Sequence, residues 1–209
     1  ISEIVGEEHI GWRYDPIFID DKYTVKYHLE QFEGISAALQ GYTKNCVISF
    51  LDLYQKVKKN FPEAKMVSRE QRMYLGEYMT RIATEHKMIL RPCGEGTELA
   101  AFGADCNGCM TQQIYENAIH MSLDMPKKQF LRKECACYLG NDIGAYNSCP
   151  HMCKYCYANY DEKSVRLNRI NHNPKSAFLI GDDMPNDKVH KAVQKSWING
   201  QISLNEFLI

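Results

Sequence analysis

Residues Cys46-Val47-Ile48-Ser49-Phe50-Leu51 form a β-rich run that lies between two helical patterns. Before this run, Thr24 can cap a helix whose apolar positions recur mostly at three- and four-residue steps as far as Gly41. After it, Ser68-Arg69-Glu70-Gln71 has the form of a capping box and opens a second long helix. The run at 46–51 is therefore predicted to be a strand that is followed and preceded by helices.

Two further apolar runs extend this alternation in both directions. Residues 9–19 are predicted to be a buried strand that runs into a loop, and Met88-Ile89-Leu90 a third strand. Strands that alternate with helices are typical of parallel βα units. We therefore predict an α/β fold in which residues 1–125 are parallel βα units of a partial (β/α) barrel. Because the chain opens at Ile1 inside a running pattern, we expect it to be truncated at the N-terminus.

Composition indicates a globular protein with one substantial core, since 44% of the 209 residues are hydrophobic. The chain carries 25 basic and 26 acidic residues, which gives no overall charge signature for nucleic acid or membrane. Residues 126–175 are locally basic, either as a solvated face or as a field that attracts anions. No apolar stretch is long enough to span a membrane, and thiol usage favours a cytoplasmic location.

Three thiols stand close together in Cys149-Pro150-His151-Met152-Cys153-Lys154-Tyr155-Cys156. At this C-x3-C-x2-C spacing, one loop can ligate three irons of a 4Fe-4S cluster and leave the fourth iron open. A zinc site is the main alternative, because four-cysteine zinc sites also use C-x2-C pairs. A disulfide framework is disfavoured by the odd count of nine cysteines and by the lack of a visible signal peptide. Residues 126–159 are loop-rich, so metal–thiolate bonds would help to order them.

The remaining thiols suggest a second site, either an auxiliary iron–sulphur cluster or zinc. Its candidate ligands are Cys93, Cys106, Cys135 and Cys137. One of Cys135 and Cys137 could instead cap the open iron of the first site. Cys109 fits these patterns least well and is expected to be a free thiol. The cysteine region at 126–209 is predicted to end in a helix over residues 187–199 and to pack as one unit with the barrel.

Several elements near the triplet resemble an uncharacterised bacterial family, a domain of unknown function. They are Cys135-Ala-Cys137, Asp142-Ile143-Gly144-x-Tyr146 and Tyr155-Cys156-Tyr157-Ala158-Asn159, and Trp12 to Pro16 and Cys93-Gly94-Glu95 also look like that family. Its members end in a cysteine cluster similar to the iron–sulphur motif of radical S-adenosylmethionine (SAM) enzymes. The resemblance implies that Cys149, Cys153 and Cys156 ligate a 4Fe-4S cluster. In radical SAM enzymes, however, the triplet follows the first barrel strand, whereas here it follows the βα region.

The resemblance implies the cluster but no reaction, and we predict a radical SAM-like enzyme of unknown substrate. The open iron would bind SAM, and an electron from a donor such as ferredoxin or flavodoxin would cleave it to a 5′-deoxyadenosyl radical. Residues at predicted strand ends would hold SAM or substrate, namely Arg13, Asp15, Asp52 and Glu95. The simpler interpretation of an Asp after a strand is a turn or a helix cap. No Gly-Gly-Glu segment that would grip the SAM amino group is evident.

Side chains within and beside the triplet have expected supporting roles. Tyr155 and Tyr157 would shield the cluster, and His151 either donates a hydrogen bond to it or lies on the loop surface. The competing hypothesis is a non-enzymatic zinc or iron–sulphur module with a structural or redox role. A nucleic-acid substrate that uses the basic segment at 126–175 is a further hypothesis, although the net charge does not indicate it.

Overall fold

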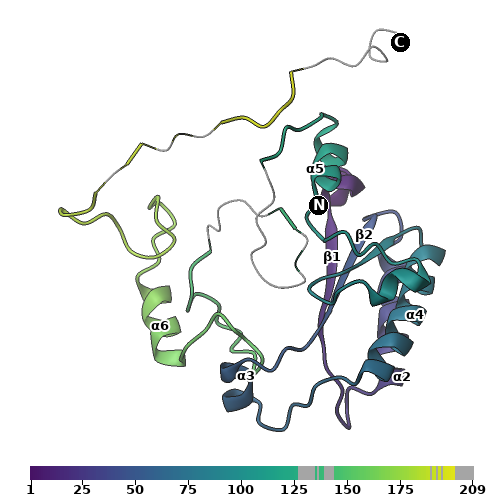
Figure 1. Cartoon of the computed structure of the whole chain (residues 1–209). Coiled ribbons are helices and arrows are strands. Elements are labelled where there is room, and N and C mark those ends of the chain that lie inside the picture. The colour runs from purple at the N-terminus through teal and green to yellow at the C-terminus, as the bar shows by residue number, and fades with distance from the viewer. Residues whose placement is uncertain are drawn as a thin grey trace. The chain divides into compact units, whose positions relative to one another are not determined.

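The computed structural model describes residues 1–126, 135, 137–138, 144–188, 190–191, 193 and 195–200 (Figure 1). Part of the basic segment at 126–175 lies outside these residues. The elements follow in the order α1 (Ser2–Val5), η1 (Glu7–His9), β1 (Gly11–Ile17), α2 (Val25–Leu39), β2 (Asn45–Phe50), α3 (Gln55–Asn60), α4 (Arg69–Glu85), β3 (Ile89–Pro92), η2 (Glu98–Phe102), α5 (Gln112–Ile119) and α6 (Glu162–Ile170). In the described residues, no helix combines the length and apolar character needed to cross a membrane.

The three strands form one parallel sheet in the order β1-β2-β3. Val47 of β2 pairs with Arg13 of β1 on one side and with Arg91 of β3 on the other. Since paired residues of neighbouring strands point to the same side of a sheet, these three form a row on one face. The predicted α/β class with parallel βα units is confirmed.

Alternate residues of the strands point to the helix-covered face of the sheet. Cys46 and Ile48 of β2 are fully buried there, together with Phe32 of α2 and Met79 of α4. Figure 1 shows α2 and α4 beside the sheet. Val47 is buried on the opposite face, where it packs against cysteines instead of helices. β2 is therefore covered on both faces, which explains why Cys46, Val47 and Ile48 follow one another without a polar residue between them.

Both predicted helix starts are confirmed by their caps. The Thr24 side chain accepts a hydrogen bond from the backbone N–H of Tyr27. At Ser68, the side chain accepts from the N–H of Gln71, whose own side chain accepts from the N–H of Ser68. These reciprocal bonds satisfy donors that the first helical turn leaves unpaired.

Gly76 lets η2 pack closely against α4. A Cβ atom at Gly76 would lie 2.3 Å from Cδ2 of Leu99, which is itself buried. We expect Gly76→Ala to lower the free energy of unfolding by about 1–3 kcal/mol, because overpacking strains a filled core. Gly34→Ala is the control, since a Cβ there would meet no atom within 4 Å. Urea unfolding of both variants measures the difference, and equal stability would contradict the close packing.

The chain divides into two units, each of which is described by itself. The first comprises Ile1–Leu51, Val67–Leu139 and Lys195–Ile209, and the second Asp52–Met66 and Gly140–Gln194. The sheet with α2 and α4 belongs to the first unit, whereas α3 and α6 belong to the second. The boundary predicted between residues 125 and 126 stays a prediction.

The predicted C-terminal helix over 187–199 is wrong in the described residues of that segment, none of which is helical. Leu123 and Ile198 form an antiparallel bridge. The N–H of Asp124 donates to the carbonyl of Trp197 at 2.7 Å, and the N–H of Asn199 to the carbonyl of Ser122 at 2.8 Å. These backbone bonds tie residues 197–199 to an extended partner, which helical geometry would not allow.

Candidate functional site

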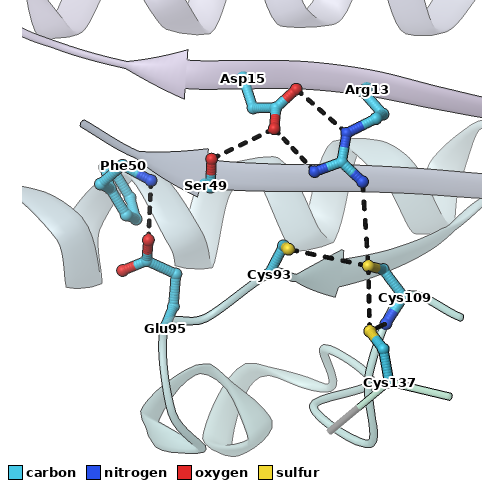
Figure 2. Close-up of polar contacts among 8 residues, drawn as sticks. All are labelled: Arg13, Asp15, Ser49, Phe50, Cys93, Glu95, Cys109 and Cys137. Atoms are coloured by element: carbon cyan, nitrogen blue, oxygen red, sulfur yellow. Dashed lines mark hydrogen bonds and ion pairs between the residues drawn. The ribbon is translucent and has the colours of Figure 1, made fainter. Parts of the chain in front are cut away.

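Four cysteines of the first unit come together on the face of β2 that the helices leave uncovered. Sγ of Cys109 lies 3.3 Å from Sγ of Cys137 and 3.7 Å from Sγ of Cys93. The Cys135 thiol contacts that of Cys137, and these thiols pack against Val47. Figure 2 shows the sulphurs of Cys93, Cys109 and Cys137 directed toward one another. Residues from three separate segments thus converge on one small volume.

Arg91 of β3 positions the loop that carries Cys109. Its buried guanidinium pairs with Asp105, and Nη1 also lies 3.4 Å from the carbonyl of Gly108. Asp105 in turn accepts a hydrogen bond from the backbone N–H of Asn107 at 2.9 Å. Because Arg91 is fixed by its place in the sheet, the loop from 105 to 109 is fixed relative to β3.

Hydrogen bonds lower the pKa of the Cys137 thiol. The Cys109 S–H donates to its sulphur, and the backbone N–H groups of Met110 and Cys109 also donate, the latter at 3.3 Å. These donors lower the pKa of Cys137 to about 5, although burial of the thiol acts in the opposite direction. Donation to Cys137 and Cys93, together with burial, raises the pKa of Cys109.

Arg13, which was predicted to bind SAM or substrate, contacts both the thiol group and a second predicted residue, Asp15. Its Nη2 pairs with Oδ2 of Asp15 at 2.8 Å, and its Nη1 lies 3.8 Å from Sγ of Cys109 (Figure 2). The Ser49 hydroxyl donates to Asp15 at 3.2 Å. The structure thus brings Arg13 to the cysteines and pairs Asp15 with Arg13, although both lie within β1 and not beyond its end.

The other two proposed catalytic residues make different contacts. Glu95 accepts a hydrogen bond from the backbone N–H of Phe50 at 2.8 Å, and its second oxygen lies 3.4 Å from Nη1 of Arg72. It therefore ties the end of β2 to α4. Asp52 opens the second unit, where its carboxylate accepts from the hydroxyl of Tyr54 at 3.0 Å.

The structure separates Cys106 from the other candidate ligands of the second site and places Cys109 among them. Cys106 packs against the main core with the helices, and Cys109 joins the cysteine group. The signal that could have identified Cys109 is the C-x2-C pair itself, which marks the loop without showing which thiol faces inward. That choice depends on the long-range contacts of Arg91.

The Cys149–Cys156 loop belongs to the second unit and leaves its thiols more accessible. Cys149 and Cys153 are exposed and Cys156 is half-buried. The N–H of Cys156 donates to the carbonyl of Cys153 at 2.9 Å, and Nδ2 of Asn159 donates to the carbonyl of Cys149 at 2.7 Å. The loop backbone is therefore held while two of the sulphurs face solvent.

Two lysines and two tyrosines of the second unit lie in or beside this loop. Nζ of Lys56 donates to the carbonyl of Tyr157 at 2.7 Å and stands 3.3 Å from the ring centre of Tyr160. Lys154 pairs with Glu63 at 2.9 Å. Tyr157 and His151 are exposed and Tyr155 is half-buried, so the structure places only Tyr155 partly inside the loop.

An open, mostly apolar pocket of about 430 Å³ lies beside the same loop. It is lined by Pro150 and Met152 of the loop and by residues of α6, namely Glu162, Val165, Arg166, Arg169 and Ile170. α6 starts at the cap Asp161, whose side chain accepts from the N–H of Ser164 at 2.8 Å. Neither this helix nor the pocket is predicted by the local sequence pattern.

Among the residues that the structure describes, no three His, Cys, Asp or Glu side chains already stand where they could share one metal ion.

A comparison with protein-family models matches residues 1–158 to the family described as Domain of unknown function (DUF1848). The matched range contains both cysteine groups. Comparisons with the curated proteins and with the solved structures give no match.

Proposed function

The chain belongs to the DUF1848 family, whose function is unknown, and we propose that it is an iron–sulphur protein of the radical SAM type. Cys149, Cys153 and Cys156 would hold a 4Fe-4S cluster. The observation that carries the proposal is a single loop with three closely spaced thiols, tied at its backbone and open to solvent at Cys149 and Cys153. Its substrate is unknown.

An orphaned polar atom beneath the loop supports a ligand there. Asn159 is only 5% exposed, and its Nδ2 is oriented by the carbonyl of Cys149, which can only accept. Its Oδ1 is buried and finds no hydrogen-bond partner among the described residues. Buried polar atoms are nearly always paired, so a donor that binds at the loop would satisfy this oxygen.

The thiols outside the Cys149–Cys156 loop already contact one another, which favours a cluster with one open iron. Cys135 and Cys137 take part in the thiol group of the first unit, which argues against either as the fourth ligand of the triplet. With three cysteine ligands, one iron is free to bind SAM, and the cluster supplies the electron for reductive cleavage of SAM. An electron donor such as ferredoxin or flavodoxin would be needed.

The residues of the pocket would contribute binding and orientation. Arg169 and Arg166 present cations near the loop, although Arg166 shares its charge with Glu162. Val165 and Ile170 provide apolar contact for a ring or chain. This side of the loop suits a molecule with both an anionic and an apolar part, and SAM has both. The assignment of Arg13, Asp15, Asp52 and Glu95 to SAM or substrate stays a prediction.

We further propose that the sheet is part of a (β/α) barrel. Its strands adjoin in sequence order, and helices connect them on one face. A doubly wound sheet would reverse its strand order at a switch point, whereas a barrel would not.

The alternative function is a non-enzymatic metal-binding module. It would use the same cysteine ligands but would not bind SAM.

The test is anaerobic reconstitution with iron and sulphide, followed by electron paramagnetic resonance of the reduced protein. We expect about four irons per chain and a cluster signal that shifts when SAM is added. Cys153→Ser should lose the signal, whereas Cys106→Ser, whose half-buried thiol packs against the core of the first unit, should keep it. A signal indifferent to SAM would support the non-enzymatic module, and a chain that binds only zinc would refute the proposal.

A further inference from the structure

We propose that Cys93, Cys109, Cys135 and Cys137 form a four-thiolate zinc site that uses none of the thiols of the Cys149–Cys156 loop. The four residues belong to the first unit and gather against Val47 on one face of the sheet. Zinc is bound by tetrahedral sets of four cysteines in structural sites. The site would be closed, with every ligand position filled by the chain.

The distances between sulphurs favour one central ion over an iron–sulphur cube. With Zn–S bonds of about 2.3 Å in tetrahedral geometry, neighbouring thiolates stand roughly 3.8 Å apart. The sulphurs of Cys93 and Cys109 are 3.7 Å apart, and those of Cys109 and Cys137 are 3.3 Å apart. In a 4Fe-4S cube each cysteine binds a different iron, so the cysteine sulphurs of neighbouring ligands stand well beyond contact with one another. The separation of Cys93 and Cys109 already matches a zinc site, whereas Cys109 and Cys137 would have to separate by a few tenths of an ångström and the four sulphurs would have to turn toward one central point.

The surroundings of the thiols also suit thiolate ligands. Backbone N–H groups of Cys109 and Met110 donate to Sγ of Cys137, and metal-bound sulphur commonly accepts such bonds from its outer shell. Four thiolates around Zn²⁺ carry a net charge of −2. The guanidinium of Arg13, at 3.8 Å from Sγ of Cys109, offsets part of that charge. These donors belong to the loop that carries Cys109 and to β1, so a bound metal would hold this loop and the strand together.

A redox-active dithiol is the other chemistry open to close cysteines, and burial argues against it. Cys109, Cys135 and Cys137 are 8%, 6% and 5% exposed, whereas reactive cysteines need access to their partners. Four converging thiols also exceed the two that a disulfide needs. Residues 103–111 contain no helix or strand, so metal–thiolate bonds would supply order that regular structure does not.

The test measures metal content in the full chain purified without added iron. We expect about one zinc per chain, bound by four thiolates as in structural zinc sites. Cys109→Ser should lose the zinc, and Cys106→Ser should keep it, because the half-buried Cys106 packs against the helix-covered core and not among these thiols. The triple variant Cys149→Ser/Cys153→Ser/Cys156→Ser should also keep it, which separates this site from the proposed iron–sulphur loop.

A second measurement covers the case in which Cys109→Ser does not fold. Wild-type chain grown with cobalt should show the thiolate-to-metal charge-transfer and ligand-field bands of a tetrahedral four-sulphur site. Iron and sulphide retained in the triple variant would overturn the proposal in favour of a second cluster. A metal-free chain with a Cys109–Cys137 disulfide, detected by peptide mass spectrometry, would overturn it in favour of a redox pair.

Discussion

Arg91→Met is expected to lower the free energy of unfolding by about 3 kcal/mol, because removing one partner of a buried ion pair leaves the other charge uncompensated. The Arg91 side chain is 9% exposed and that of Asp105 is 26% exposed, so the lower end of the range for buried pairs applies. The carbonyl of Gly108 and Oδ1 of Asn45 would lose a donor as well. Urea unfolding of the two proteins measures the difference.

The same substitution should weaken metal binding at the thiols of the first unit. Arg91 holds the loop from Asp105 to Cys109, so its loss lets Cys109 move away from Cys137. We expect a lower zinc content at equal protein concentration. The matched control is Arg81→Met, whose partner Glu85 lies on the exposed surface of α4 and whose loss should change stability by no more than about 0.5 kcal/mol. If both variants unfold alike and keep equal zinc, Arg91 does not position the loop.

Local sequence signals predict the sheet and its helices because each depends on nearby residues. The caps at Thr24 and Ser68 are satisfied within three residues of the chain. The run at 46–51 is apolar at every position but Ser49 because β2 is buried on both faces. Strand order then follows because consecutive strands joined by helical crossovers usually lie side by side, so the sheet with its helices can be predicted from the amino-acid sequence.

The cysteine site could be predicted only in part, because its geometry depends on contacts between distant residues. The sequence singled out Cys93, Cys135 and Cys137 but could not separate Cys106 from Cys109. Their separation follows from an ion pair between β3 and the loop, and nothing in the spacing encodes it. The helix predicted over residues 187–199 is wrong for the same reason. Its apolar spacing fits a helix, but residues 197–199 instead form backbone hydrogen bonds with residues 122–124.

Phe32→Ala is expected to cost about 3–5 kcal/mol of unfolding free energy, the usual range for deleting a fully buried phenylalanine. Phe32 has no exposed surface, stacks on Trp12 with ring centres 5.0 Å apart, and meets the edge of Tyr14 at 5.4 Å. The truncation removes this contact area and leaves a cavity between α2 and β1. Phe178→Ala is the control, since that ring is half-exposed and its loss should change stability by no more than about 0.5 kcal/mol.

Trp12 provides a local readout of this change, provided that the chain's other tryptophan is replaced by Trp197→Phe. In that background, fluorescence during urea unfolding reports the packing of β1 directly. Trp12 and Tyr14 alternate along β1 with Arg13 and Asp15, which face the thiols. Loosening one face of the strand should therefore release the other, and metal-free Phe32→Ala should react faster with a thiol reagent at Cys109. Unchanged reactivity despite lower stability would show that the thiol group is held by its loops and not by β1.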